Sequence, residues 1–398
     1  MITEEQENKK QDLEEVFDEI VEESLEEHQI DLEIDKPCLI FERNDLIRIM
    51  NLVSKIVLVK SEVPEYNSVT LIPDPEAKTL TVKASNELSQ FSTTIELLGE
   101  PDKMLKETFA VPYTLLQKVY TFLGSKVLIF KDGIDYYIRL SNGDLVIGAR
   151  PVNLEKIKFV GEVGDKLSET KISELAELAS LFLPIMRDDI NTDGKRLRVQ
   201  ENKAYYNSNF FYLETKTTLP DLTLSLRDLE FIQSLVKYYD GLSAVVCSVK
   251  TSNVLRFYFK VDKIEYMFIS TKQESDNSFL QRVQEMFKPS EIKVDRKELS
   301  RLTALSIDLP NVTGYLKLKY DALNLNISIE TNKHSSLMKI PSELLVSEFN
   351  NEEVTVKSIL LNNLLQSFTP YNEVGIATTK ANLSLQSDET KAIMLIGG

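Results

Sequence analysis

The stretch KSILLNNLLQSFTPYNEVGIATTKANLSLQSDETKAIMLIGG, residues 357–398, has the pattern of one helix followed by three short strands. The same order occurs twice earlier in the chain. FAVPYTLLQKVYTFLG (109–124) predicts a strand that runs into a helix, because Pro112 suits a helix start and Gly124 a helix end. SLRDLEFIQSLVKYYDG (225–241) predicts another helix, with Ser225 as its cap and Gly241 as its stop. Three alternating strand patterns follow each of these helices.

Each of these blocks is preceded by a further helix and three more strand patterns. The preceding helical patterns lie at 41–57, 170–186 and 293–307. The element order therefore repeats three times, with a period of roughly 115–125 residues, and each unit is long enough to bury its own core. We predict an α+β fold of three repeated domains, each with two helices packed on antiparallel sheets. The expected bounds are 37–160, 161–288 and 289–398.

The first 36 residues differ from the rest of the chain in charge. They carry 15 acidic residues and three lysines, a net charge of −12, whereas the other 362 residues carry 43 basic and 47 acidic groups. Apolar residues from Leu13 to Val21 recur at helical spacing, with carboxylates on the opposite face. This acidic arm is either a solvated, partly ordered extension, or a helix that docks on a partner or competes for a basic surface.

The sequence lacks the motifs of common nucleotide-binding and hydrolytic sites. It contains no G-x-x-x-x-G-K-S/T loop, no G-x-G-x-x-G and no G-x-S-x-G. His28 and His334 are isolated, and Cys38 and Cys247 are too few for a disulfide framework or a zinc site. We predict a protein that is not an enzyme and that uses no metal or cofactor.

Two further patterns bear on metals and on location. Asp188, Asp189 and Asp193 lack the spacing of a calcium loop and are interpreted as part of a solvated loop. No apolar run approaches the ~18 residues of a membrane span. The acidic N-terminus does not have the pattern of a secretory signal. We expect a cytoplasmic protein with no membrane partner.

Several stretches together resemble the bacterial-type DNA polymerase sliding clamp, the beta subunit that acts as a processivity factor. SFLQRVQEMFKPSEIKVDRKEL (278–299) is similar to the family's crossover into its third domain. FAVPYTLLQKVYTFLG is similar to the second helix of its first domain, and residues 354–398 are similar to its closing helix and strands. The resemblance covers residues 37–398. It implies sheets outside, helices inside, and two chains that close head to tail into a six-domain ring around double-stranded DNA. The divergence indicates a phage-encoded or otherwise distant member.

A ring that slides has to attract phosphates without reading bases, so it needs lysine and arginine spread over its inner helices. On the first helix Asn44, Arg48, Asn51 and Lys55 share one face, which contains no acid. The resemblance implies that Lys60, in the following loop, also contacts DNA.

The predicted DNA-binding set draws on all three units. It comprises Arg43, Arg48, Lys55, Lys60, Lys118, Arg227, Lys237, Arg296, Lys297, Arg301 and Lys357. For any one of them the alternative is an ordinary solvated helix face, and it is the collective pattern that favours DNA. The helix at 170–186 does not fit this basic pattern, since Glu174 and Glu177 would repel phosphate if they faced the opening.

The resemblance also implies a hydrophobic cleft for partner peptides between the second and third domains. Ile393, Met394 and Leu395 match the strand that lines it, although they would serve equally well as plain core. The other wall departs from the family pattern, with Asn207, Ser208, Asn209 and Phe210 where the family has a Gly-His-Arg-Leu type of stretch. We therefore expect a different peptide preference.

Two functions remain open at the level of sequence. The first is a sliding clamp that tethers DNA polymerase, together with a clamp loader or transcription factors, to duplex DNA as a homodimeric ring. The second is a clamp-like scaffold that binds polymerase or transcription proteins without encircling DNA, with the acidic arm as its interaction element. The helix at 170–186 and the altered cleft favour the second slightly.

Overall fold

The structure is a computed structural model. It describes residues 38–63, 66–86, 88–101, 103, 105–118, 126–132, 135–140, 146–151, 163–188, 196–208, 210–239, 241–249, 256–269, 283, 285–308, 312–321, 323–331, 335–346 and 353–396. The acidic arm, Asp189, Asp193 and Asn209 lie outside these ranges, as does the expected boundary at 160. The boundary at 288 stays a prediction.

The first unit contains eight of the described strands and two of the described helices. Its elements are β1 (Cys38–Glu42), α2 (Arg43–Val53), β2 (Ser68–Asp74), β3 (Thr79–Ser85), β4 (Ser89–Glu96), β5 (Phe109–Pro112), α3 (Tyr113–Leu116), β6 (Lys126–Asp132), β7 (Asp135–Leu140) and β8 (Val146–Pro151).

The second unit has the same order. Its elements are β9 (Val163–Lys171), α4 (Ile172–Asp188), β10 (Arg196–Gln200), β11 (Lys203–Asn207), β12 (Phe211–Lys216), β13 (Leu222–Ser225), α5 (Leu226–Tyr239), β14 (Ser243–Val249), β15 (Arg256–Val261) and β16 (Ile264–Ile269).

The third unit repeats the order again. Its elements are β17 (Ile292–Asp295), α7 (Arg296–Asp308), β18 (Val312–Tyr320), β19 (Asn324–Thr331), β20 (Ser335–Leu344), β21 (Val354–Lys357), α8 (Ser358–Ser367), β22 (Glu373–Thr378), β23 (Asn382–Ser387) and β24 (Thr390–Leu395).

The strand pairing repeats together with the element order. Numbered within a unit, the first, sixth, seventh and eighth strands are hydrogen-bonded neighbours in that order. The fifth, second, third and fourth strands are neighbours in a second series. A helix follows the first strand and another follows the fifth. The threefold repetition and the α+β class predicted from sequence are therefore confirmed.

The helices form where apolar residues are spaced for a helix. In α2, Leu46, Ile49, Met50 and Val53 are buried, which is the i, i+3, i+4, i+7 stripe of an amphipathic helix. The α5 helix starts at its predicted cap, where the Ser225 hydroxyl oxygen accepts a hydrogen bond from the Asp228 backbone N–H at 3.2 Å. It ends before Gly241, whose φ of +84° suits a residue without a Cβ.

Two seams join the units into long sheets. At the first seam β4 pairs antiparallel with β16, with Phe91 opposite Tyr266. At the second seam β12 pairs antiparallel with β24, with Tyr212 opposite Ile393. The described strands thereby form two runs of 12 strands. Since the fourth strand of one unit pairs with the eighth strand of the next at both seams, the joints are equivalent.

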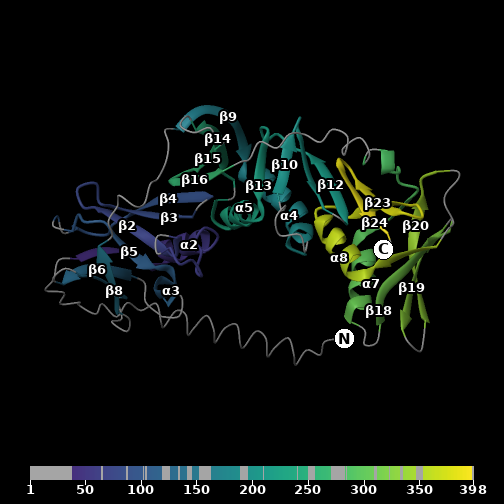
Figure 1. Ribbon diagram of the computed structural model, residues 1–398, viewed down its shortest axis with the longest axis horizontal. Helices are drawn as coiled ribbons and strands as arrows, with labels where there is room; N and C mark the ends of the chain where they lie inside the picture. Colours follow the sequence, from purple (N-terminus) through teal and green to yellow (C-terminus); the bar gives the residue numbers. More distant parts are fainter. Residues whose placement is uncertain are drawn as a thin grey trace, which may run out of the picture.

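The three units follow one another along an arc (Figure 1). Strands such as β9, β14 and β10 lie on its convex side, and α2, α5, α4, α8 and α7 succeed one another along the other side. Buried side chains from all three units form one extended hydrophobic core between these layers. Among the helices that the structure describes, none is both long and apolar enough to cross a membrane.

Candidate DNA interface and partner cavity

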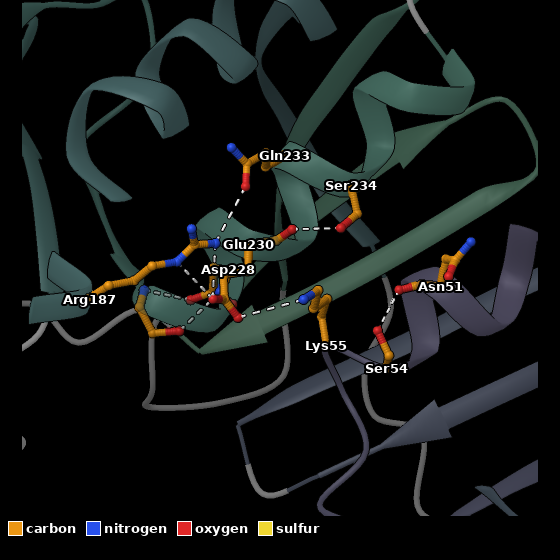
Figure 2. Close-up of polar contacts among 9 residues, drawn as sticks. Asn51, Ser54, Lys55, Arg187, Asp228, Glu230, Gln233 and Ser234 are labelled. Carbon is orange, nitrogen blue, oxygen red and sulfur yellow. Dashed lines mark hydrogen bonds and ion pairs between the residues drawn. The ribbon is translucent and has the colours of Figure 1, made fainter. Parts of the chain in front are cut away.

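The predicted polar face of α2 meets α5 across the first seam (Figure 2). Lys55 Nζ lies 4.0 Å from Oε2 of Glu230. Asn51 donates a side-chain hydrogen bond to the Tyr238 hydroxyl. The Arg48 guanidinium lies 5.6 Å from the centre of the Tyr239 ring. This face therefore helps to join the first two units.

The expectation that this face contains no acid needs correction. Arg48 donates a hydrogen bond to Oδ1 of Asp45 at 2.9 Å, because side chains three positions apart on a helix are neighbours. The side chains of Arg48 and Lys55 are 35% and 32% exposed, so each offers only part of its surface to a ligand. Their positive charges are partly balanced within the protein.

Glu230 is the centre of a small charge network on this side of the arc. Arg187, in the last turn of α4, donates from Nε to Oε1 of Glu230 at 3.2 Å and lies 3.5 Å from Oε1 of Gln233. Figure 2 shows Arg187 and Lys55 reaching Glu230 from opposite sides. One carboxylate thus lies between two cations. Arg187 was not predicted as a site residue, although a basic residue at the end of that helix was visible in the sequence.

The other predicted cations divide by exposure. Those that are exposed are Lys60, Lys118, Arg227, Lys237 and Lys297. Arg43 is half-buried. Arg301 is exposed and donates to Oε2 of Glu298 at 2.8 Å. The exposed residues come from all three units, and they remain candidates for phosphate contacts.

Arg296 does not belong in the predicted set. Its side chain is 9% exposed, and its Nε donates to the backbone carbonyl of Tyr371 at 3.0 Å. Its backbone N–H donates to the carbonyl of Asn372 at 2.9 Å. The residue ties the start of α7 to the segment after α8. A buried guanidinium that donates to a backbone carbonyl is a structural contact, because a buried donor left without a partner costs free energy.

A cavity of about 250 Å³ opens at one end of the second seam. It will be called the lysine-rimmed cavity. Its lining residues are Phe210, Tyr315, Thr355, Val356, Lys357, Leu360, Lys380, Met394, Leu395 and Ile396. The second unit contributes Phe210, whose carbonyl accepts a hydrogen bond from the Leu395 N–H at 3.0 Å. Lys357, which stays a predicted DNA contact, is exposed and also lines this cavity, with its Nζ 6.0 Å from the centre of the Phe210 ring.

The residues predicted for the cleft separate into two groups. Phe210, Met394 and Leu395 line the cavity. Ile393 lies on the other face of β24, in a cluster with Tyr205, Tyr212 and Val283, because successive strand residues point to opposite faces. Ile393 does not line this cavity, and its place in a partner cleft stays a prediction.

The remaining predicted residues shape or flank the turn before β12. Ser208 Oγ accepts hydrogen bonds from the N–H groups of Phe210 and Phe211 at 3.2 and 3.1 Å, which fixes the turn that presents Phe210. Asn207 is exposed at the end of β11. Sequence reasoning missed Tyr315, Leu360 and Lys380, because they come from separate elements that only the fold brings together.

A buried polar cluster lies at the first seam. Asp228 is 2% exposed, and its carboxylate accepts hydrogen bonds from the Ser225 N–H at 2.6 Å and from the Tyr266 hydroxyl. Ser89, from the first unit, lies 3.4 Å from Oδ1 of Asp228 and 3.1 Å from the Tyr266 hydroxyl. Burial raises the pKa of the Asp228 carboxyl above its ordinary value, and the hydrogen bonds oppose that shift.

Comparison with known proteins finds similarity in the fold but not in the sequence. No family model and no curated protein matches the sequence. Solved structures match it almost end to end. The DNA polymerase III beta subunit of Thermotoga maritima has a TM-score of 0.73 at 12% identity, covering 91% of this chain and 99% of that one. The chain has the fold of a bacterial DNA sliding clamp.

Two further sliding clamps give the same result. The DNA polymerase sliding clamp of Bacillus subtilis has a TM-score of 0.72 at 10% identity, covering 92% of this chain and 100% of that one. The Helicobacter pylori beta clamp bound to a DNA ligase peptide has a TM-score of 0.69 at 12% identity, covering 91% and 100%. The sliding-clamp fold thus spans all three units of the chain.

Proposed function

We propose that this protein is a DNA sliding clamp, a non-enzymatic ring that encircles double-stranded DNA and tethers a polymerase to it. The observation that carries the proposal is the three-unit arc, which corresponds to solved sliding clamps over 91% of the chain. Tethering acts by raising the effective concentration of the polymerase at its template.

The pairing rule of the two seams supports closure into a ring. At each seam a fourth strand pairs with the eighth strand of the next unit. By that rule β20, the fourth strand of the third unit, should pair with the eighth strand of another unit. In the same way β8, the eighth strand of the first unit, should pair with the fourth strand of another unit. Along Ser335–Pro341, β20 pairs only with β19 among the described strands, and along Val146–Ala149, β8 pairs only with β7. A second copy placed head to tail supplies both partners and closes a six-domain ring.

Diffuse electrostatics supply the contact with DNA in this proposal. Exposed cations such as Lys60, Lys237 and Lys297 lie on different units, and no single cluster dominates. Contacts of this kind bind phosphates, respond strongly to salt and carry no base specificity. That combination suits a ring that has to move along DNA.

The lysine-rimmed cavity is the proposed docking site for the polymerase and for other factors, such as a clamp loader or transcription proteins. Its apolar side chains Phe210, Leu360 and Met394 provide a hydrophobic floor, and Lys357 and Lys380 add positive charge. We propose that it binds short partner segments in which apolar residues are flanked by an acidic one. The DNA ligase peptide on the Helicobacter pylori clamp is a precedent for peptide binding on this fold.

The decisive experiment measures oligomeric state and retention on DNA together. Mass photometry over a range of concentrations should show a dimer. The protein loaded on nicked circular DNA should remain bound through a high-salt wash and slide off after the DNA is linearised. Equal retention on open linear DNA would contradict encirclement.

A persistent monomer would favour a clamp-like scaffold that binds polymerase or transcription proteins without encircling DNA. One observation favours that function, because Arg48 on α2 and Lys55 in the turn after it are paired with Asp45 and Glu230. This pairing reduces the positive charge that the first unit offers to phosphates. The experiment above separates the two functions.

A further inference from the structure

The second seam has another cavity at its opposite end. This acidic groove, about 760 Å³ in volume, is lined by Glu174, Glu177, Asp388 and Glu389, among other residues. The strand β24 runs from the turn at Asp388 and Glu389 to the lysine-rimmed cavity at Leu395. Six strand residues span ~17 Å, so the two cavities are separate. They mark the two ends of one joint.

The lining of the acidic groove combines negative charge with an apolar floor. Its charged residues are four carboxylic acids and a single lysine, Lys216, which pairs with Glu389 across the seam. Leu175, Leu178 and Leu181 of α4 also line it, and each is at most 5% exposed. Glu174 and Glu177, the acids of the 170–186 helix that would repel phosphate, alternate with these leucines along α4. They therefore belong to the lining of this groove.

A buried hydroxyl in the groove lacks a partner. Thr170, at the end of β9, lines the groove and is 3% exposed. Its Oγ1 has no hydrogen-bond partner. Neighbouring hydroxyls are satisfied, since Thr390 donates to Thr215 at 3.0 Å and contacts the Tyr371 hydroxyl at 2.6 Å. A buried polar atom without a partner is costly, so a ligand that supplies a donor would be stabilised there.

The charge of the groove narrows the class of ligand. Phosphate of DNA would be repelled by four carboxylates. The chain's own acidic arm, with a net charge of −12, would be repelled too. The carboxylates are also not arranged as a metal site, since the described residues contain no group of three or more His, Cys, Asp or Glu able to hold a metal ion.

We propose that the acidic groove is a second docking surface, which binds a basic amphipathic segment of a partner protein. Apolar side chains of the segment would rest on Leu175, Leu178 and Leu181, and its lysines or arginines would face Glu174, Glu177 and Asp388. One cationic group would donate to Oγ1 of Thr170. Because the two cavities lie at opposite ends of the seam, the groove and the lysine-rimmed cavity can be occupied at once by partners of opposite charge.

The test uses the full chain without DNA and a fluorescein-labelled 16-residue peptide with lysine and leucine on opposite helical faces. A scrambled peptide of the same composition measures non-specific attraction. The double variant Glu174→Gln with Glu177→Gln should bind the amphipathic probe at least five-fold more weakly. The control variant Glu76→Gln with Glu100→Gln makes the same change in charge at exposed sites on the first unit and should bind as the wild type does.

Equal affinity of the wild type and the groove double variant would overturn the proposal, because the probe would then be held elsewhere, for example by the acidic arm. A second variant, Thr170→Val, keeps the shape and removes only the hydroxyl that has no partner. It should unfold at the same temperature as the wild type, or higher, and bind the probe two- to three-fold more weakly. Unchanged affinity would remove Thr170 from the site and overturn the argument that rests on it. None of these readouts depends on ring formation.

Discussion

The two seams of this protein use the same strand pairing but differ in the side chains that are buried at them. At the first seam Asp228, Tyr266 and Ser89 form a buried polar cluster, and α2 meets α5 through charged side chains. At the second seam the buried polar contacts join hydroxyls, with Thr390 donating to Thr215 at 3.0 Å, and a cavity opens at each end. The first joint thus buries a carboxylate, whereas these buried contacts of the second join neutral hydroxyls.

The hollows at the two seams also differ in charge. A hollow of about 670 Å³ at the first seam is lined by three lysines and three acids, among which Lys263 pairs with Glu96 at 2.7 Å. The cavities of the second seam are unbalanced, one positive and the other negative. Unbalanced charge beside an apolar floor is what recognition of a charged partner requires. This difference supports the proposal that partners dock at the second seam, whereas buried hydrogen bonds help to join the units at the first.

The largest expected effect is on the buried cluster of the first seam. Tyr266→Phe removes a hydrogen bond to the buried Asp228 carboxylate, which should lower the free energy of unfolding by about 1.5–3 kcal/mol. Urea denaturation at pH 7 measures it. Losing a donor raises the pKa of Asp228 further, so the folded variant binds protons more readily and the difference should shrink as the pH falls.

Tyr238→Phe is the matched control for that measurement. It removes an exposed hydroxyl that accepts a hydrogen bond from Asn51 at the same seam. The expected loss is below about 0.5 kcal/mol, since surface substitutions of this kind are usually small. Equal losses in both variants would mean that the buried cluster has no special role in the joint.

A smaller effect is expected for peptide binding at the second seam. Phe210→Ala removes the only wall of the lysine-rimmed cavity that the second unit supplies among the described residues. Binding of a labelled peptide with leucine and phenylalanine next to an aspartate should weaken about tenfold, equivalent to ~1.4 kcal/mol. Fluorescence anisotropy measures it. Phe287→Ala, which alters the cluster on the other face of β24, should leave the affinity unchanged.

The smallest expected effect concerns DNA. Glu230→Gln keeps the shape of the side chain but removes the carboxylate shared by Lys55 and Arg187. DNA affinity at low salt should rise a few-fold, and the slope of log K against log salt should steepen by no more than about one unit. Glu353→Gln, whose partner is Lys317 on β18, serves as the control and should not change the slope. An unchanged slope in Glu230→Gln would mean that the network does not face DNA.

Much of the fold was predictable because helix periodicity, strand alternation and helix caps are patterns of neighbouring residues. The helix from Leu226 to Tyr239 could be bounded in advance from Ser225 and Gly241, and the repeated element order followed from strand alternation and helix periodicity. The candidate site was less predictable. Arg296 looked like an exposed cation but is buried and donates to the carbonyl of Tyr371, and Lys357 is exposed as expected but also lines a cavity.

The sequence by itself determined the repeating order of helices and strands, since that order depends on periodicity, caps and turns within a few residues. It also set the charge of each segment. Only the tertiary structure decided which charges meet. Glu230 of α5 lies between Arg187 of α4 and Lys55 in the turn after α2, and the acids of α4 line one groove with Asp388 and Glu389. Contacts between residues so far apart in the chain depend on how whole units pack. Patterns of neighbouring residues do not contain that information.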